Sequence, residues 1–135
     1  MKQSIELKNL ILQWYASISS GEDPGTFGSL FSRQEGFLAI VSEPTEWWQS
    51  PEKIIQGYRE MAKAGTLEIK VIDLKAYREG TVGWVADRVV LTMPNKIEVP
   101  IWHTFILHKE NGEWKIVLAH YSTEVPDEEA GFDPA

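Results

Sequence analysis

The 135-residue chain predicts an α+β fold, in which three N-terminal helices are followed by an antiparallel sheet. Before Gly65, apolar residues recur every three or four positions, as they do in amphipathic helices. After Gly65, segments rich in Val, Ile, Thr and aromatic residues alternate with turn residues. Because the helices come before a run of strands, we expect the helices to cover one face of a single sheet.

The first helix is predicted over residues 4–19, where the apolar residues have helical spacing. A proline directly after a polar residue is typical of the first turn of a helix. Pro24 therefore predicts a short second helix over residues 24–31. Pro51 follows a serine in the same way and predicts a third helix over residues 51–64.

A short buried strand is predicted at residues 37–41, between the second and third helices. Longer strands follow at residues 66–78, 81–92, 97–109 and 113–123. The last two strands flank Asn111-Gly112, which is the strongest short sequence signal for a hairpin. These strands therefore form an antiparallel meander.

The turns allow a register to be predicted. A two-residue turn at Asn111-Gly112 places His103 opposite His120, and a turn centred on Pro94-Asn95 places Arg88 opposite Ile101. The inner face of the sheet would then carry Val82, Trp84, Ala86, Arg88, Ile101, His103, Phe105, Leu107, Trp114, Ile116, Leu118, His120 and Ser122. This face is apolar except for Arg88, His103, His120 and Ser122 at one end. A bulge near residue 86 would exchange Arg88 with Asp87.

The opposite face is also too apolar for a sheet surface in contact with water. It would carry Val85, Asp87, Val89, Trp102, Thr104, Ile106, Lys115, Val117, Ala119 and Tyr121. Three helices can cover only one face of the sheet. We therefore expect a second copy of the chain to cover the outer face, which gives a two-fold homodimer.

The formal net charge of −7 is unevenly distributed. Residues 124–135 carry −5 and form a predicted acidic C-terminal tail, whereas residues 1–123, the predicted domain, carry −2. This charge argues against nucleic acid as a partner, since phosphate binding needs a basic surface. No apolar segment approaches the roughly 20 residues that would span a membrane.

The chain contains no cysteine, which excludes disulfides and thiol chemistry. Glu6 and Lys8 interrupt the apolar pattern at the N-terminus, so we expect no signal peptide there. A chain with neither feature is expected in the cytoplasm.

Three segments carry a resemblance to a known family. FLAIVSEPTEWWQSPEKI (37–54), GWVADRVV (83–90) and NGEWKIVLAHYS (111–122) resemble SnoaL-like domains of the nuclear transport factor 2-like superfamily. The resemblance covers residues 5–125 and implies a cone-shaped roll around an apolar pocket. Members of this superfamily include ketosteroid isomerases, polyketide cyclases, dehydratases and non-catalytic ligand-binding or assembly modules.

The resemblance also assigns positions. WYASISSGED places Tyr15 where ketosteroid isomerases have a hydrogen-bonding tyrosine, and His103 takes the place of their protonated aspartate. Their general-base aspartate is missing here, because its strand has Leu38-Ala39-Ile40 instead. The steroid isomerase mechanism therefore does not carry over. In SnoaL-type cyclases the acid–base residue lies on the later strands, in the region where this chain has His120.

These observations predict a pocket for a small apolar molecule. If the domain is catalytic, we expect cofactor-free isomerisation, cyclisation or dehydration. His120 or His103 would transfer a proton, Tyr15 would donate a hydrogen bond and Arg88 would bind an anionic group. The expected ligand-binding residues are Arg88, Trp84, Trp48, Tyr58, Phe105 and Ser122. No cofactor and no metal are expected.

Each assignment has an alternative. The histidines could be a hydrogen-bonded core pair, or two ligands of a metal hydrolase site. Arg88 could form an ion pair with Glu35, Glu43 or Glu46. The whole domain could be a non-catalytic ligand sensor or dimerisation module. In that case its own side chains, notably those of Trp84, Phe105 and Trp114, would fill the pocket.

Overall fold

The computed structural model describes residues 1–41 and 47–123. The predicted acidic tail at 124–135 lies outside the described residues, as do Glu43 and Glu46. The elements are β1 (Lys2–Gln3), α1 (Ile5–Ser19), η1 (Pro24–Leu30), β2 (Leu38–Ile40), β3 (Trp47–Trp48), α2 (Glu52–Ala62), β4 (Glu68–Glu79), β5 (Val82–Thr92), β6 (Glu98–Glu110) and β7 (Glu113–Thr123). The predicted α+β fold is confirmed.

Helix α1 begins where a serine caps it. The Ser4 hydroxyl accepts a hydrogen bond from the backbone N–H of Leu7 at 3.2 Å, which satisfies one of the free amides of the first turn. The helix buries Leu7, Ile11, Trp14, Tyr15 and Ile18, whose spacing places them on one side. Tyr15 therefore points from the helix into the core.

The second predicted helix, at residues 24–31, is not an α-helix. Residues Pro24–Leu30 form a short 3₁₀ segment, in which Phe27 departs from helical geometry. Two glycines, Gly25 and Gly28, lie within these seven residues and weaken any α-helix there. Asp23 does not cap the segment with its side chain and instead binds Arg59 of α2 at 2.8 Å. The described residues thus contain two α-helices rather than three.

Helix α2 corresponds to the third predicted helix. The Ser50 hydroxyl accepts a hydrogen bond from the backbone N–H of Glu52 at its start. Ile54, Ile55 and Tyr58 form its buried side. Neither helix in the described part of the chain is long and apolar enough to cross a membrane.

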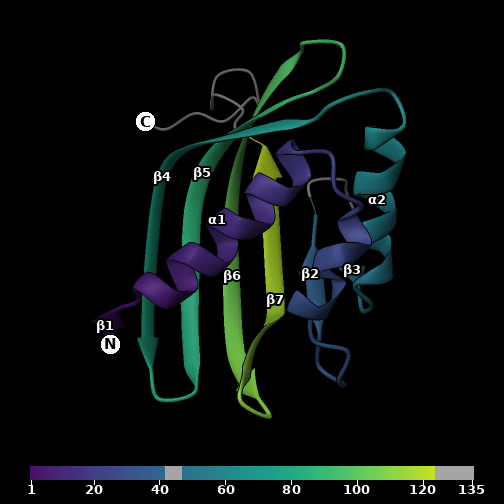
Figure 1. Cartoon of the computed structure of the whole chain (residues 1–135). Helices are drawn as coiled ribbons and strands as arrows, with labels where there is room; N and C mark the ends of the chain where they lie inside the picture. Colours follow the sequence, from purple (N-terminus) through teal and green to yellow (C-terminus); the bar gives the residue numbers. More distant parts are fainter. Residues whose placement is uncertain (42–46, 124–135) are drawn as a thin grey trace, which may run out of the picture.

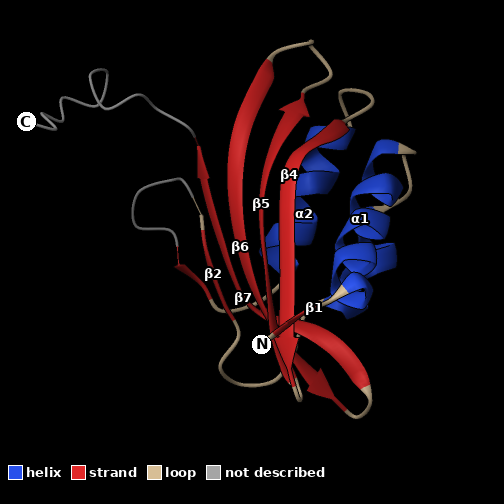
Figure 2. Cartoon of the chain, turned by 90° about the vertical axis from the view of Figure 1, so that its left-hand side faces the viewer, coloured by secondary structure: helices blue, strands red, loops and turns tan. Residues whose placement is uncertain are grey.

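The strands form one curved sheet in the order β1-β4-β5-β6-β7-β2-β3. The prediction of a purely antiparallel sheet is wrong in one place, because β2 pairs with β7 in parallel. Helix α1 crosses the sheet diagonally and α2 lies near β2 and β3 (Figure 1). Both helices lie on the same side of the sheet (Figure 2). This side is called the inner face below, and the other side the outer face.

The predicted register between β5 and β6 is wrong by one residue. Residues Met93 to Ile97 connect the strands, and the backbone N–H of Met93 donates to the carbonyl of Ile97, which leaves a three-residue loop at Pro94 to Lys96. Lys96 has a φ of 72°, which is typical of the last residue of a three-residue hairpin loop. Asp87, rather than Ala86, therefore lies opposite His103, and Arg88 lies opposite Trp102.

The register between β6 and β7 is correct beside the turn and wrong beyond it. Leu107 pairs with Ile116 as predicted, but Ile106 pairs with Leu118. The strand β7 therefore has one extra residue, Val117, which is a β-bulge. Beyond this bulge every side chain of β7 changes face. Tyr121, rather than His120, lies opposite His103.

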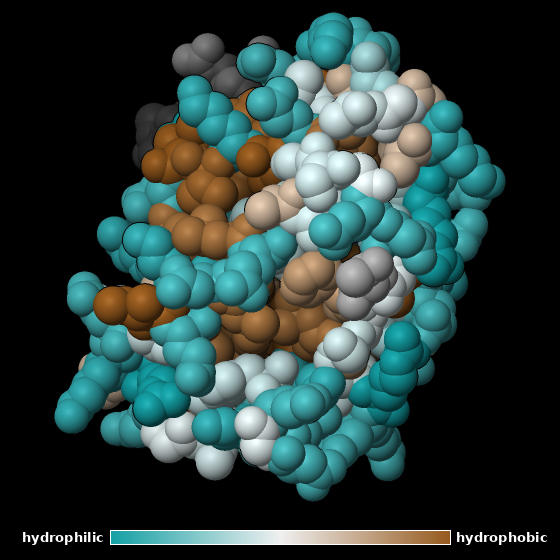
Figure 3. Space-filling view, in the orientation of Figure 1, coloured by the Kyte–Doolittle hydropathy of each residue, from teal (hydrophilic) through white to brown (hydrophobic). Residues whose placement is uncertain are grey.

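These two shifts revise the composition of the faces. Ile101, His103, Phe105, Leu107, Trp114 and Ile116 lie on the inner face as predicted. Val82, Trp84, Ala86, Arg88, Leu118, His120 and Ser122 lie on the outer face, and Val85, Asp87, Val89, Ala119 and Tyr121 lie on the inner face, contrary to the prediction. Apolar surface is visible on both sides of the diagonal that α1 takes across the inner face (Figure 3).

Candidate functional site

The candidate site is a buried cluster where α1 meets the middle of the sheet. Asp87 of β5 and His103 of β6 are cross-strand partners, and the side chains of both are 2% exposed or less. Tyr15 of α1 reaches both of them. A carboxylate, an imidazole and a phenol thus meet inside an otherwise apolar core.

The hydrogen bonds fix where the protons lie. Tyr15 donates its hydroxyl to Asp87 Oδ2 at 2.5 Å, and His103 Nδ1 lies 2.8 Å from Asp87 Oδ1. A carboxylate oxygen can only accept, so Nδ1 of His103 carries a proton and donates it. The Tyr15 oxygen lies 3.0 Å from the same nitrogen. In a neutral imidazole, Nε2 is then an unprotonated acceptor.

The free nitrogen of His103 is itself buried. Among the described residues, Nε2 has no hydrogen-bond partner, and the same is true of the Tyr121 hydroxyl. The two rings are cross-strand neighbours and pack edge to face, with centroids 4.8 Å apart. An unpaired polar atom in a core is costly. A bound molecule that forms hydrogen bonds with these two atoms would remove this cost.

A cavity of about 340 Å³ lies beside these two rings. It extends between the sheet and α2, and its lining includes Trp48, Ile54, Tyr58, Met61, Leu91, Met93, Ile101, His103 and Tyr121. The described lining residues include no lysine and no arginine. The polar groups of this lining belong to Trp48, Tyr58, His103, Tyr121 and Thr123, and its other side chains are apolar.

Three phenols, Tyr15 of the buried cluster and Tyr58 and Tyr121 of the cavity lining, remain protonated at neutral pH. Burial, and next the Asp87 carboxylate, raise the pKa of Tyr15 well above its usual value. Burial followed by Asp87 also raises the pKa of Tyr58. The pKa of Tyr121 is raised by burial, by Tyr58 and by Asp87. Each phenol can therefore act as a hydrogen-bond donor rather than as a base.

Four predicted site residues come together here. His103 and Tyr15 belong to the buried cluster, while Trp48 and Tyr58 line the cavity with His103. Phe105 is fully buried and stacks on the His103 ring with centroids 5.2 Å apart, so it supports the cluster from the core.

The other predicted site residues lie on the outer face. His120 is exposed and cannot meet His103, because the bulge in β7 turns it away. Arg88 is exposed beside the ring of Trp102, at 5.6 Å from its centroid, so it cannot bind an anion in the cavity. Trp84 stacks on Tyr77 of the neighbouring strand, and Ser122 pairs with Trp102.

Because of the altered register, His103 and His120 do not meet and cannot bind the same metal ion. His103 and His120 project from opposite faces of the sheet. In the part of the chain that the structure describes, no three His, Asp or Glu side chains are arranged to hold a metal ion.

Two residues of the site were missed by sequence reasoning, Asp87 and Tyr121. Both were assigned to the outer face because the loop at residues 94–96 and the bulge at Val117 were not recognised. Alternation alone could not correct this, because both faces are apolar. The sequence did contain one indication. Asp87 alternates with the apolar residues Val85 and Val89, so a strand turned by one residue would place all three on the inner face.

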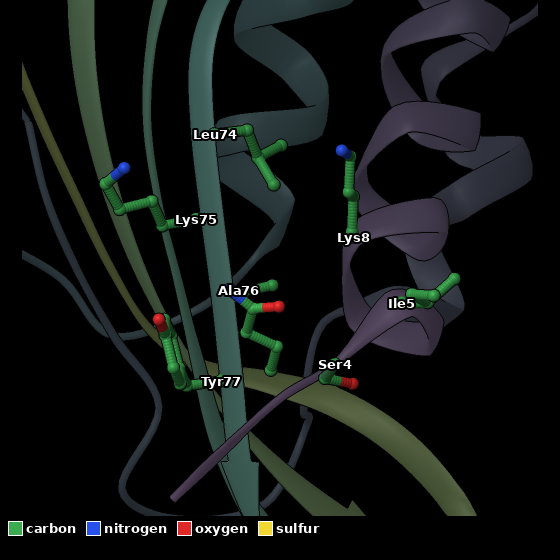
Figure 4. A pocket seen from close by; sticks show the side chains of 8 residues that line it. Ser4, Ile5, Lys8, Leu74, Lys75, Ala76 and Tyr77 are labelled. Carbon is green, nitrogen blue, oxygen red and sulfur yellow. The ribbon is translucent and has the colours of Figure 1, made fainter.

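A second hollow, of about 240 Å³, lies between the start of α1 and β4. Leu74 and Lys8 face this gap, while Lys75 and Tyr77 point to the other side of β4 (Figure 4). None of the described residues that line it is a histidine, aspartate or glutamate. The hollow therefore offers no proton-transfer group comparable to His103.

Comparison with known proteins agrees with this architecture. The family model of the SnoaL-like domain matches residues 7–128, which is most of the chain. The chain therefore belongs to the SnoaL-like domain family, as the resemblance had indicated. No curated protein matches its sequence significantly.

Several solved structures share the fold at low sequence identity. An NTF2-like protein of unknown function from Pseudomonas putida KT2440 has a TM-score of 0.75 and 12% identity, with 92% of this chain and 88% of that chain covered. A candidate calcium/calmodulin-dependent protein kinase II association domain from Xanthomonas campestris has a TM-score of 0.68 and 19% identity, with 92% and 95% covered. A candidate ketosteroid isomerase from Shewanella frigidimarina NCIMB 400 has a TM-score of 0.65 and 17% identity, with 84% and 92% covered. At such identities the likeness concerns the fold alone.

Proposed function

We propose that this domain binds a small, mostly apolar molecule in the cavity beside His103 and transfers a proton to or from it. The observation that carries the proposal is His103, which lines the cavity and whose Nε2 atom is buried and unpartnered among the described residues. The cavity volume of about 340 Å³ falls within the range of roughly 300–1,000 Å³ that is usual for ligand pockets.

In this proposal His103 is the acid–base residue. Asp87 accepts a hydrogen bond from Nδ1 and so fixes the orientation of the imidazole that lines the cavity. It also stabilises the imidazolium that forms when Nε2 takes a proton. Tyr15 occupies the second carboxylate oxygen and fixes the orientation of Asp87. The pair needs no cofactor, so isomerisation, cyclisation or dehydration by proton transfer is the reaction class it serves.

The proposal is tested by following proton exchange from a carbon acid. We would incubate the protein with 2-tetralone, an apolar bicyclic ketone, in D₂O and follow loss of its α-proton signals by NMR. We expect exchange to be faster than in buffer, and about 10²-fold slower with His103→Gln than with the wild type, since a positioned base contributes 10²–10⁴-fold. Asp87→Asn should also slow it, because the neutral amide no longer supplies the negative charge that stabilises the imidazolium.

The matched control is His108→Ala. His108 is exposed on the same strand but on the outer face. This variant should exchange protons at the wild-type rate. Equal rates with and without protein would remove the catalytic part of the proposal. A non-catalytic ligand-binding module would then be the better description.

The outer face supports a second copy of the chain as partner. Trp102 and Ile106 of β6 are 49% and 37% exposed, and Val82 of β5 is 45% exposed. Apolar side chains gathered on a sheet surface are typical of an interface. We propose a homodimer through this face. Trp102→Glu should shift the sedimentation coefficient from dimer to monomer, and a wild-type monomer at micromolar concentration would contradict the proposal.

A further inference from the structure

Two residues that line the cavity, His103 and Tyr121, each have a buried polar atom without a partner among the described residues, and the chemistry of the two atoms is complementary. When the His103 ring is neutral and Nδ1 donates its proton to Asp87, Nε2 can only accept a hydrogen bond. The Tyr121 hydroxyl has a proton to donate, and burial keeps its pKa above the usual value. Cross-strand pairing and the edge-to-face contact at 4.8 Å hold the two rings in fixed relation.

We propose that these atoms bind a hydroxyl group of an uncharged, apolar molecule, an alcohol or a phenol, which donates to His103 Nε2 and accepts from Tyr121. This inference rests on the proposed function, since it names the class of ligand for the same cavity. In this proposal Tyr121 is a ligand-binding residue. Its hydroxyl donates a hydrogen bond to the ligand oxygen that also contacts His103.

Other functional groups satisfy the pair less well. A ketone or ether oxygen can accept from Tyr121 but leaves Nε2 of His103 unpaired. A carboxylate would also leave Nε2 of His103 unpaired, because it has no proton to donate. It would also lie near the negative charge of Asp87, in a cavity whose described lining offers no lysine or arginine. A hydroxyl is the smallest group that both donates and accepts.

The remaining lining determines the body of the ligand. Ile54, Met61, Leu91 and Ile101 supply aliphatic surface, and Trp48 and Tyr58 supply rings. Such a cavity gains affinity from a flat or globular hydrocarbon. We therefore expect the hydroxyl to be attached to an apolar ring system rather than to a sugar or another polyol.

The test uses three probes that share one bicyclic body: 2-naphthol, 2-methoxynaphthalene and naphthalene. Their affinities for the full chain would be measured by fluorescence titration. We expect 2-naphthol to bind at least about tenfold more tightly than the ether, because the ether leaves the buried acceptor unpaired. Naphthalene, which leaves both atoms unpaired, should bind most weakly.

Two tyrosine variants separate the Tyr121 contact from general effects. Tyr121→Phe should weaken 2-naphthol about tenfold and leave naphthalene unchanged, since only the phenolic hydroxyl is removed. Tyr77→Phe is the matched control, because Tyr77 stacks on Trp84 of the outer face. It should leave all three affinities unchanged. Circular dichroism of each variant would verify that it is folded.

A second measurement needs no substitution. NMR of the histidine ring nitrogens in the wild-type protein should show the His103 Nε2 signal shifting when 2-naphthol is added and not when naphthalene is added. The absence of such a difference would overturn the hydroxyl assignment even if Tyr121→Phe failed to fold.

The outcomes distinguish this inference from the proposed function. Equal affinities for the three probes, or a tighter ether, would overturn the hydroxyl assignment and leave an apolar binding cavity in place. Failure of all three probes to bind would overturn both the inference and the ligand-binding function on which it rests.

Discussion

The two faces of the sheet share an apolar composition but differ in what they do with polar groups. The inner face buries Asp87 and His103 completely and pairs them with a tyrosine from α1. The outer face keeps its polar side chains, such as those of Arg88 and His120, exposed. Apolar side chains on both faces indicate only that something covers them. The buried polar cluster is what marks the inner face as the candidate site, since burying it has a cost in folding free energy.

The largest expected effect concerns two neighbouring residues of β6 that point to opposite faces. Leu107 is fully buried on the inner face, whereas Ile106 is 37% exposed on the outer face. Leu107→Ala should lower the free energy of unfolding by about 2–5 kcal/mol, because it removes buried methyl groups and leaves a cavity. Ile106→Ala should cost less than half as much. Urea unfolding of both variants measures the difference.

Comparable losses at both positions would contradict the assignment of the faces. The measurement is made at several protein concentrations. A loss for Ile106→Ala that grows with concentration would report coverage of the outer face by a second copy rather than burial within one chain.

The sequence was sufficient for every element that depends on local pattern. The helices α1 and α2, the hairpin at Asn111-Gly112 and the order of the long strands follow from apolar spacing, helix caps and turn residues. The prediction of a helix at 24–31 was wrong, because the proline start favoured a helix that two glycines weaken, and the segment is 3₁₀.

Apolar spacing and turn residues could not predict the register of the strands. A single extra residue reverses every side chain that follows it. One such residue lies in the loop before Ile97, and another is the bulge at Val117. Because both faces are apolar, neither shift violates the hydrophobic pattern. His103 and Tyr15 were identified because no shift moves them, whereas Asp87 and Tyr121 required the structure.

An intermediate effect is expected at alkaline pH, and it belongs to the inner face. Burial raises the pKa of Tyr15, Tyr58 and Tyr121 above the value of about 10 in an unfolded chain. Above pH 10 the unfolded chain loses these protons and the folded chain keeps them. The free energy of unfolding should therefore be unaffected by the tyrosines below pH 10 and fall as pH rises above it.

Each buried phenol contributes about 1.4 kcal/mol per pH unit to this fall. Urea unfolding between pH 9 and 12 measures how steeply the free energy of unfolding falls with pH. Tyr121→Phe should reduce this slope by the contribution of one phenol. An unchanged slope in that variant would mean that Tyr121 ionises equally well in the folded protein, and so is not enclosed as the structure shows.

The smallest expected effect separates the two possible registers of β7. With the regular register His120 lies beside His103 and transfers protons, whereas with the bulge at Val117 it is an exposed outer-face residue. His120→Ala should therefore change the free energy of unfolding by no more than about 0.5 kcal/mol, as is usual for exposed positions. It should also leave the 2-tetralone exchange rate at the wild-type value. Loss of exchange with the fold intact would restore His120 to the site and place the bulge in doubt. The comparison with His103→Gln, which changes the same residue type on the inner face, makes this small effect decisive.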